Sequence, residues 1–193
     1  MEIEKQQQIT MRDATIGQIY HKMHTDSSIF FLSADTGAPA LDKIREDFKD
    51  RFINVGIAEQ NLINVATGLG LEGFTVFTYA IAPFYLRAYE QIKINLSLSG
   101  QIREINVNMI GVGTGLSYEV SGPTHHCVED ITIMRSLPNF EVVSPSDWMT
   151  AKKFIDYSIN SKKPKYIRLD GKLLPLVYNK EVEFDWNKGF FEL

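Results

Sequence analysis

Short apolar segments alternate with helix-like segments along nearly the whole chain, and this alternation limits the folds that are available. The strand-like segments are almost continuously apolar, and they lie at residues 28–35, 51–55, 74–80, 105–113, 140–145 and 165–170. Strands that are apolar on both sides belong in a parallel sheet that helices cover on both faces. The alternation therefore predicts an α/β fold with a three-layer, doubly wound, mostly parallel sheet.

Helix-like segments fill the gaps between these strands. They lie at residues 12–24, from 58 onward, 83–98, 128–137 and 146–160. Pro83 suits the first turn of its helix, because proline lacks an N–H that would have no partner there. Either Ser146 or Asp147 is expected to cap the helix over 146–160.

The length and the composition suit one soluble domain. The 193 residues carry a formal net charge of −4, which argues against a general nucleic-acid binder. One cysteine excludes an intrachain disulfide, and no apolar run approaches the ~18–20 residues of a transmembrane helix, so we expect a cytoplasmic protein. We expect a single domain over 1–193, with a core over 10–178. Residues 179–193 are expected to begin a linker to a C-terminal domain that this chain lacks.

A carboxylate stands where the sequence predicts the start of a buried helix. In the stretch RFINVGIAEQN (51–61), Glu59 falls in the first turn of a helix that continues as LINVATGLGLEG, which is apolar enough to be largely buried. A buried charge is costly unless it is paired. Glu59 could simply favour the positive end of the helix, worth ~0.3–1 kcal/mol when exposed, or it could meet a ligand.

Ligands of a parallel sheet bind beyond the carboxyl ends of its strands. The strand tips at that edge are expected at Asp35, 54–59, 79–84, 113–126 and 170–172. The glycines of GVGTGL (111–116) are not followed by the helix that a dinucleotide-binding loop requires, so a tight turn explains them better.

The stretch GPTHHCVED (122–130) offers two histidines, one cysteine and two acids. Neighbouring histidines rarely reach one metal together, and no second ligand cluster accompanies them, so no metal site is predicted. A histidine in this loop could donate a hydrogen bond or a proton to a ligand, or could only cap backbone carbonyls. Adjacent side chains in an extended loop point apart, which disfavours Cys127 as a nucleophile beside His126.

Four fragments resemble, in the same order, segments of the thiamine-diphosphate enzymes of the transketolase family. They are SADTG (33–37), RFINVGIAEQNLINVATGLGLEG (51–73), FYLRAYEQI (84–92) and GPTHHCVEDITIMRSLPNFEVVSPSD (122–147). The match spans about residues 11–175. This resemblance implies the pyrimidine-binding domain of that family, whose fold contains a parallel sheet.

The resemblance assigns cofactor contacts to individual residues. Glu59 would hydrogen-bond a ring nitrogen of the aminopyrimidine, so it is expected to be catalytic as well as cofactor-binding. Phe84, with Tyr79 or Tyr89 near it, would pack against the pyrimidine. Asp35, in the strand-tip fragment SADTG, is also expected at the cofactor.

Substrate contacts are implied at the same edge. His125 would contact oxygen atoms of the substrate and take part in catalysis, and Arg12 is placed like a family arginine that contacts a substrate phosphate. Ser121 stands where the family commonly has an acidic residue, and Gly171 and Lys172 stand near a family arginine. Both Ser121 and Lys172 are expected at the substrate, and a modified or nucleotide-linked sugar is an open alternative.

One motif of the family is absent from the sequence. In the family, Gly-Asp-Gly with a downstream asparagine holds the metal that bridges the diphosphate, and this chain does not contain it. The resemblance therefore implies a separate diphosphate-binding subunit that carries Gly-Asp-Gly and binds Mg²⁺, in a dimer or heterotetramer with this chain. The chain alone is expected to be inactive.

The implied function is that of the pyrimidine-binding component of a transketolase-like enzyme. Such an enzyme would transfer a two-carbon ketol unit between sugars or sugar phosphates by means of thiamine diphosphate. A related thiamine-diphosphate synthase, or a beta-type subunit of a 2-oxoacid dehydrogenase, is the enzymatic alternative. A non-catalytic assembly subunit is the third interpretation.

Overall fold

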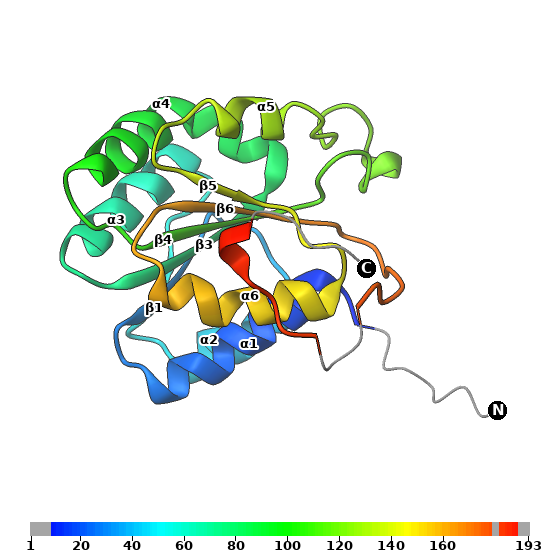
Figure 1. Ribbon diagram of the computed structural model, residues 1–193, viewed down its shortest axis with the longest axis horizontal. Helices are drawn as coiled ribbons and strands as arrows, with labels where there is room; N and C mark the ends of the chain where they lie inside the picture. Colours follow the sequence, from blue (N-terminus) through cyan, green and yellow to red (C-terminus); the bar gives the residue numbers. More distant parts are fainter. Residues whose placement is uncertain (1–8, 179–181, 189–193) are drawn as a thin grey trace.

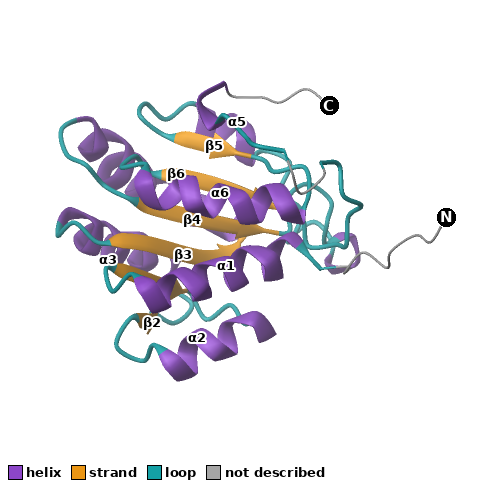
Figure 2. Ribbon diagram, turned by 60° about the horizontal axis from the view of Figure 1, so that its bottom comes forward, coloured by secondary structure: helices purple, strands orange, loops and turns teal. Residues whose placement is uncertain are grey.

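The six strands of the protein point the same way in one sheet. The computed structural model describes residues 9–178 and 182–188, and its strands are β1 (Ile29–Ser33), β2 (Phe52–Asn54), β3 (Thr75–Ile81), β4 (Val107–Val112), β5 (Glu141–Val143) and β6 (Lys165–Leu169). Each neighbouring pair in the order β2-β1-β3-β4-β6-β5 is parallel (Figure 2). The parallel sheet predicted from the sequence is confirmed.

Helices cover both faces of this sheet, as the three-layer prediction requires. One face carries α1 (Met11–Thr25), α2 (Asp42–Asp47) and α6 (Trp148–Asn160), and the other carries α3 (Glu59–Leu71), α4 (Tyr89–Gln91) and α5 (Asp130–Arg135) (Figure 1). Asp147 caps α6, because its Oδ1 accepts a hydrogen bond from the Thr150 N–H at 2.7 Å. Among the described residues, no helix is both long and apolar enough to span a bilayer.

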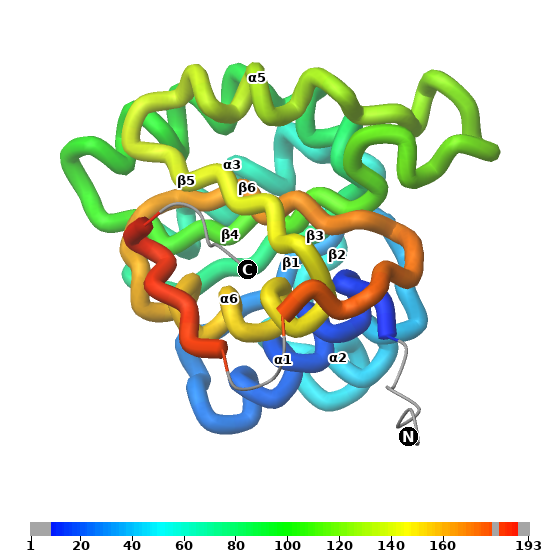
Figure 3. Tube along the Cα trace, turned by 45° about the vertical axis from the view of Figure 1, so that its right-hand side comes forward, coloured from blue at the N-terminus to red at the C-terminus, as the bar shows by residue number. Residues whose placement is uncertain are grey.

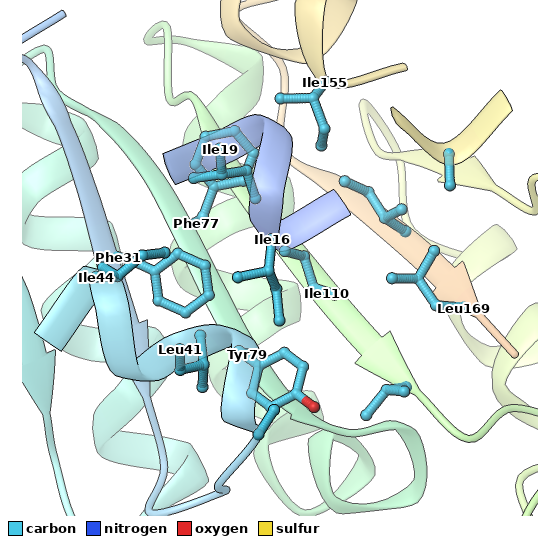
Figure 4. Close-up of a cluster of buried hydrophobic side chains, with 14 of the residues drawn as sticks. Ile16, Ile19, Phe31, Leu41, Ile44, Phe77, Tyr79, Ile110, Ile155 and Leu169 are labelled. Atoms are coloured by element: carbon cyan, nitrogen blue, oxygen red, sulfur yellow. The ribbon is translucent and has the colours of Figure 1, made fainter. Parts of the chain in front are cut away.

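Two apolar clusters, one on each face, hold the layers together. In the first cluster, Ile16 of α1 packs with Phe31 of β1 (Figure 4). In the second, Leu62 of α3 packs with Val76 of β3. All four side chains are shielded from solvent. Because both faces are covered, polar side chains that meet a ligand are left to the ends of the strands.

The segment predicted as one helix over 83–98 is less regular than expected. A 3₁₀ helix, η2 (Ala82–Ala88), leads into the single α-helical turn of α4 and then into a π-helical stretch, η3 (Ile92–Leu98). Tyr85 is fully buried, and its hydroxyl lies 2.8 Å from Thr78 Oγ1 on β3, which holds η2 against the sheet. Departures from α-helical geometry are short in most proteins and often mark functional sites.

The described C-terminal residues pack back on α6. The ring centre of Trp186 lies 5.0 Å from that of Phe154 and 6.3 Å from that of Tyr157, both on α6 (Figure 3). The linker expected over 179–193 stays a prediction, since residues 179–181 and 189–193 lie outside the described residues.

A lysine is buried at the edge of the sheet where β6 begins. Lys165 is shielded from solvent. Its Nζ donates to the side-chain oxygen of Asn106 at 3.1 Å and to two backbone carbonyls, those of Ser161 at 2.8 Å and Lys163 at 2.6 Å. Burial lowers the pKa of Lys165 from the ordinary 10.5 to about 7.

We predict that folding stability rises between about pH 7 and pH 8.5. In this range the unfolded chain keeps Lys165 protonated while the folded chain releases the proton, so raising the pH favours the folded state. The free energy of unfolding should increase by about 1 to 2 kcal/mol over this window, measured by urea denaturation at each pH. Lys165→Met should flatten the dependence, and an unchanged slope in that variant would contradict the prediction.

Candidate active site

Asn54, the last residue of β2, fixes the loops that follow two neighbouring strands. Its Oδ1 accepts hydrogen bonds from the backbone N–H groups of Asp35 and Gly56, both at 3.0 Å, and its Nδ2 donates to Asp35 Oδ1 at 3.0 Å. Asp35 at φ 55° and Gly56 at φ 75° adopt left-handed conformations, which turn the chain sharply after β1 and β2. The exposed Asp35 is thus engaged with Asn54 beside the loop that leads to Glu59.

Glu59 is the first residue of α3, and only 2% of it is exposed. Its Oε2 accepts a hydrogen bond from Arg87 Nη1 at 3.1 Å, while 60% of the Arg87 side chain remains exposed. No side chain or backbone group in the described ranges hydrogen-bonds the other oxygen, Oε1. A buried carboxylate with one oxygen unpaired is suited to a hydrogen bond with a ligand, because leaving that oxygen unpaired is costly.

The helix η2 connects this carboxylate with a histidine. Residues three apart lie on the same side of a 3₁₀ helix, so Phe84 and Arg87 share one side of η2. The Phe84 ring meets the His125 ring edge-on, with 5.5 Å between ring centres and 64° between ring planes. Nδ1 of His125 lies 3.0 Å from Thr124 Oγ1, which leaves Nε2 available. Glu59, Phe84 and His125 are therefore grouped around η2.

Three further residues expected at the site lie apart from this group. Tyr79 is buried in the core on the α1 face (Figure 4), and burial raises the pKa of Tyr79 while the positive charge of Arg12 opposes that rise. Arg12 pairs with Asp13 (Nε to Oδ1, 2.7 Å), and this hydrogen bond raises the pKa of Arg12. The hydroxyl of Tyr89 lies 3.3 Å from Ser136 Oγ, directly after α5.

The loops that follow β4 and β6 are joined to each other at the same edge. Lys172 forms an ion pair with Glu119, at the start of the short 3₁₀ helix η5 (Glu119–Ser121), and Ser121 itself is exposed. Tyr118 packs against Gly171 so closely that a Cβ on this glycine would lie 2.6 Å from the ring. Ser121 and Lys172 therefore belong to one surface, beyond the ends of β4 and β6.

Two anchors hold the histidine loop, residues 122–129, on the domain. Gly115 and Cys127 exchange two backbone hydrogen bonds of 2.8 and 2.9 Å. Asp130, fully buried at the start of α5, accepts hydrogen bonds from Arg168 Nε at 2.8 Å and from the Tyr166 hydroxyl at 3.0 Å, both on β6. Burial and this carboxylate raise the pKa of Tyr166 well above its ordinary value, so its hydroxyl remains a donor.

Cys127 is poorly suited to act as a nucleophile. Burial, together with the nearby Asp130 and Glu129 carboxylates, raises the pKa of its thiol to about 12. The reactive thiolate is therefore scarce near neutral pH. In the part of the chain that the structure describes, no group of three or more His, Cys, Asp or Glu side chains could hold a metal ion.

Arg87 is the site residue that the sequence did not reveal. It lies 28 positions from Glu59, and Arg168 lies 38 positions from Asp130, so neither pair follows a local pattern. The one signal available was indirect: a carboxylate predicted to be buried requires a cation from somewhere else in the fold.

The sequence that builds this geometry matches a known protein family. Residues 7–176 match the family model described as "transketolase, pyrimidine binding domain". The chain belongs to this family. The matched region of this transketolase pyrimidine domain contains the whole sheet, Glu59, η2 and the histidine loop, so the resemblance of the four fragments is confirmed.

Two relatives of this transketolase pyrimidine domain share one name, which describes each of them as one of the subunits of an apulose-4-phosphate transketolase. The chain is 42% identical over 140 residues to the one from Actinobacillus succinogenes, covering 72% of this chain and 44% of that protein. It is 32% identical over 167 residues to the one from Phocaeicola vulgatus, covering 85% of this chain and 52% of that protein. The chain thus spans about half the length of the curated relatives it matches.

Solved structures agree with the fold of this transketolase pyrimidine domain. One, named "split gene transketolase, inactive beta4 tetramer", superposes with a TM-score of 0.79 at 29% identity and covers 93% of this chain and 57% of that chain. A transketolase from Pichia stipitis superposes with a TM-score of 0.78 at 18% identity, covering 89% of this chain and 27% of that chain. The second likeness shows the fold alone.

Asp130→Asn should destabilise the domain by about 3 kcal/mol, because it removes the counter-charge of an arginine that is itself largely buried. The free energy of unfolding from urea denaturation measures this loss. Glu129→Gln, at the exposed neighbouring position, serves as the control and should cost less than about 0.5 kcal/mol. A similarly small effect of both substitutions would contradict the anchoring role of Asp130.

Proposed function

We propose that this chain is the pyrimidine-binding component of a split transketolase-like enzyme, which transfers a two-carbon ketol unit between sugars by means of thiamine diphosphate. The observation that carries the proposal is the buried Glu59 carboxylate, whose Oε1 has no partner among the described residues, in a transketolase pyrimidine domain. The Actinobacillus succinogenes relative is named for apulose 4-phosphate. A sugar phosphate of that kind is the proposed substrate.

The described residues fit the pyrimidine half of the cofactor. Glu59 would hold a proton between Oε1 and a ring nitrogen, and Phe84 offers an aromatic surface on the side of η2 that also carries Arg87. When bound, thiamine diphosphate supplies the reactive ring that carries the ketol unit. His125, with Nδ1 engaged by Thr124, would present Nε2 to an oxygen atom of the substrate.

The diphosphate half of the cofactor is assigned to a separate subunit that carries Gly-Asp-Gly. Within the described residues, no cluster of acidic side chains could hold Mg²⁺, so the metal is assigned to that subunit as well. The proposed assembly is a dimer or heterotetramer of the two kinds of subunit. The name of the solved relative, an inactive tetramer of beta chains, is compatible with a chain that needs a partner for activity.

Exposed apolar side chains around the candidate site fit a covering partner. They follow β2 and β4 at the carboxyl edge, and their exposed fractions are 76% for Ile57, 58% for Leu116, 95% for Val120 and 70% for Val128. Ile57 lies two residues before Glu59, and Val128 lies three residues after His125. A partner seated on this edge would bury these side chains and exclude water from the carboxylate.

Glu59→Gln should lower the rate of ketol transfer by the assembled enzyme at least about 100-fold, because an amide cannot hold the proton that the carboxylate holds at the ring nitrogen. The assay uses this chain with the Gly-Asp-Gly subunit, thiamine diphosphate, Mg²⁺ and a sugar-phosphate donor. Glu72→Gln, an exposed glutamate at the other end of α3, is the matched control and should leave the rate unchanged. Undiminished transfer by Glu59→Gln, or turnover by this chain without the partner, would refute the proposal.

Val120→Asp should weaken association with the Gly-Asp-Gly subunit at least about tenfold, because it places a charge in the apolar surface that the partner would cover. Titration calorimetry of the two proteins measures the affinity. Ile102→Asp is the control, since Ile102 is 84% exposed but precedes β4, at the opposite edge of the sheet. Equal affinities of the two variants would place the partner elsewhere.

A further inference from the structure

The ion pair between Glu59 and Arg87 is uneven in two respects. Only 3% of the Glu59 side chain is exposed, against 60% of the Arg87 side chain. One guanidinium nitrogen, Nη1, contacts one carboxylate oxygen, Oε2, at 3.1 Å. The guanidinium therefore reaches the carboxylate from the solvent side, and the second oxygen is left for another partner.

The backbone of Arg87 is held in place independently of its charge. The Gln60 side chain donates from Nε2 to the Arg87 carbonyl at 3.3 Å. Two residues before Arg87, the buried Tyr85 hydroxyl lies 2.8 Å from Thr78 Oγ1. Position 87 therefore stays next to Glu59 even when its side chain is changed, which makes substitution there a clean test of charge.

Two titratable side chains of η2 act on the Glu59 carboxylate, and one of them is charged. Tyr85 interacts with it electrostatically, but burial raises the pKa of Tyr85 so far that its hydroxyl stays neutral. Arg87 is the cation that contacts the carboxylate among the described residues. Burial alone would drive a carboxylate to take up a proton, and a neighbouring cation opposes this.

We propose that Arg87 is a positioning residue that keeps Glu59 ionised, so that the proton between the carboxylate and the pyrimidine comes from outside and resides at the ring nitrogen. This inference rests on the proposed function, in which Oε1 faces that nitrogen. A carboxyl group already protonated would instead act as the donor and leave the ring nitrogen without a positive charge. Arg87 on Oε2 thus decides which of the two partners carries the proton.

The exposed position of Arg87 adds a second expectation. In the isolated chain, water screens the guanidinium, so its effect on Glu59 is modest. A partner that covers this edge would remove that water and strengthen the attraction between the two groups. The effect of removing the charge at position 87 should therefore be larger in the assembled enzyme than in the isolated chain.

The first experiment follows the Glu59 carboxyl carbon by nuclear magnetic resonance in the isolated chain, with its signal identified by its loss in Glu59→Gln. In Arg87→Gln, the pH at which the signal moves halfway should lie about one unit higher than in the wild type. Arg87→Lys should lie closer to the wild type than to Arg87→Gln. Arg103→Gln removes an exposed charge elsewhere and should change nothing. An unmoved signal in Arg87→Gln would overturn the proposal.

The second experiment measures thiamine diphosphate binding to the assembled enzyme, with Mg²⁺, as a function of pH. While Glu59 is ionised in the free enzyme, binding takes up a proton, so Kd should rise about tenfold per pH unit. In Arg87→Gln this rise should begin at a pH at least one unit higher. A purely structural defect would instead raise Kd equally at every pH, and that result would overturn the role of Arg87.

The failure of the proposed function is distinguishable from the failure of this inference. If the wild-type assembly bound no thiamine diphosphate at any pH, the proposed function would fall, and the resonance of the isolated chain would still report whether Arg87 keeps Glu59 ionised. If binding occurred with the same pH dependence in Arg87→Gln and the wild type, only the inference about Arg87 would fall.

Discussion

The burial of the Glu59 carboxylate is the constraint on which the candidate site depends. The helix that begins with Glu59 is so apolar that it must enter the core, and the preceding Ala58 offers no side chain to cap it. The compensating cation therefore has to come from another element, and η2 supplies it through Arg87. The 3₁₀ geometry of η2, with Tyr85 bonded to Thr78, directs Arg87 to α3 and Phe84 to the histidine loop. The irregular segment is thus explained by what it must reach.

The domain contains two buried acids at helix starts, and they are paired in different ways. Asp130 is enclosed by Arg168 and Tyr166, and only 13% of the Arg168 side chain is exposed. Glu59 has a single contact to an arginine that is mostly in solvent. The first arrangement satisfies its carboxylate and fixes the histidine loop, whereas the second leaves the carboxylate free to bind something else. The same chemical pair therefore serves structure in one place and is open to a ligand in the other.

The sequence predicted the fold well because period and polarity are local properties, and it predicted the site less completely because the site is made by distant pairs. The strands, the three layers and the cap at Asp147 all follow from neighbouring residues. The contact between Glu59 and Arg87 depends on how η2 and α3 meet, which no local pattern encodes. Tyr79 shows an avoidable error of grouping: side chains alternate along a strand, so Tyr79 faces away from Thr78 and Tyr85, into the layer that contains α1.

The strand order has a consequence for when the domain can become complete during synthesis. β6 lies between β4 and β5 although it is the last strand in the chain, and β5 has no other neighbour among the described strands. The backbone of β5 must therefore wait, unpaired, until β6 has emerged and inserted beside β4, which is a slow kind of step because it joins segments far apart in sequence. Arg168 arrives with β6. The loop that carries His125 consequently gains its ionic anchor only at the end of folding, after the core around β1 and β3 is already available.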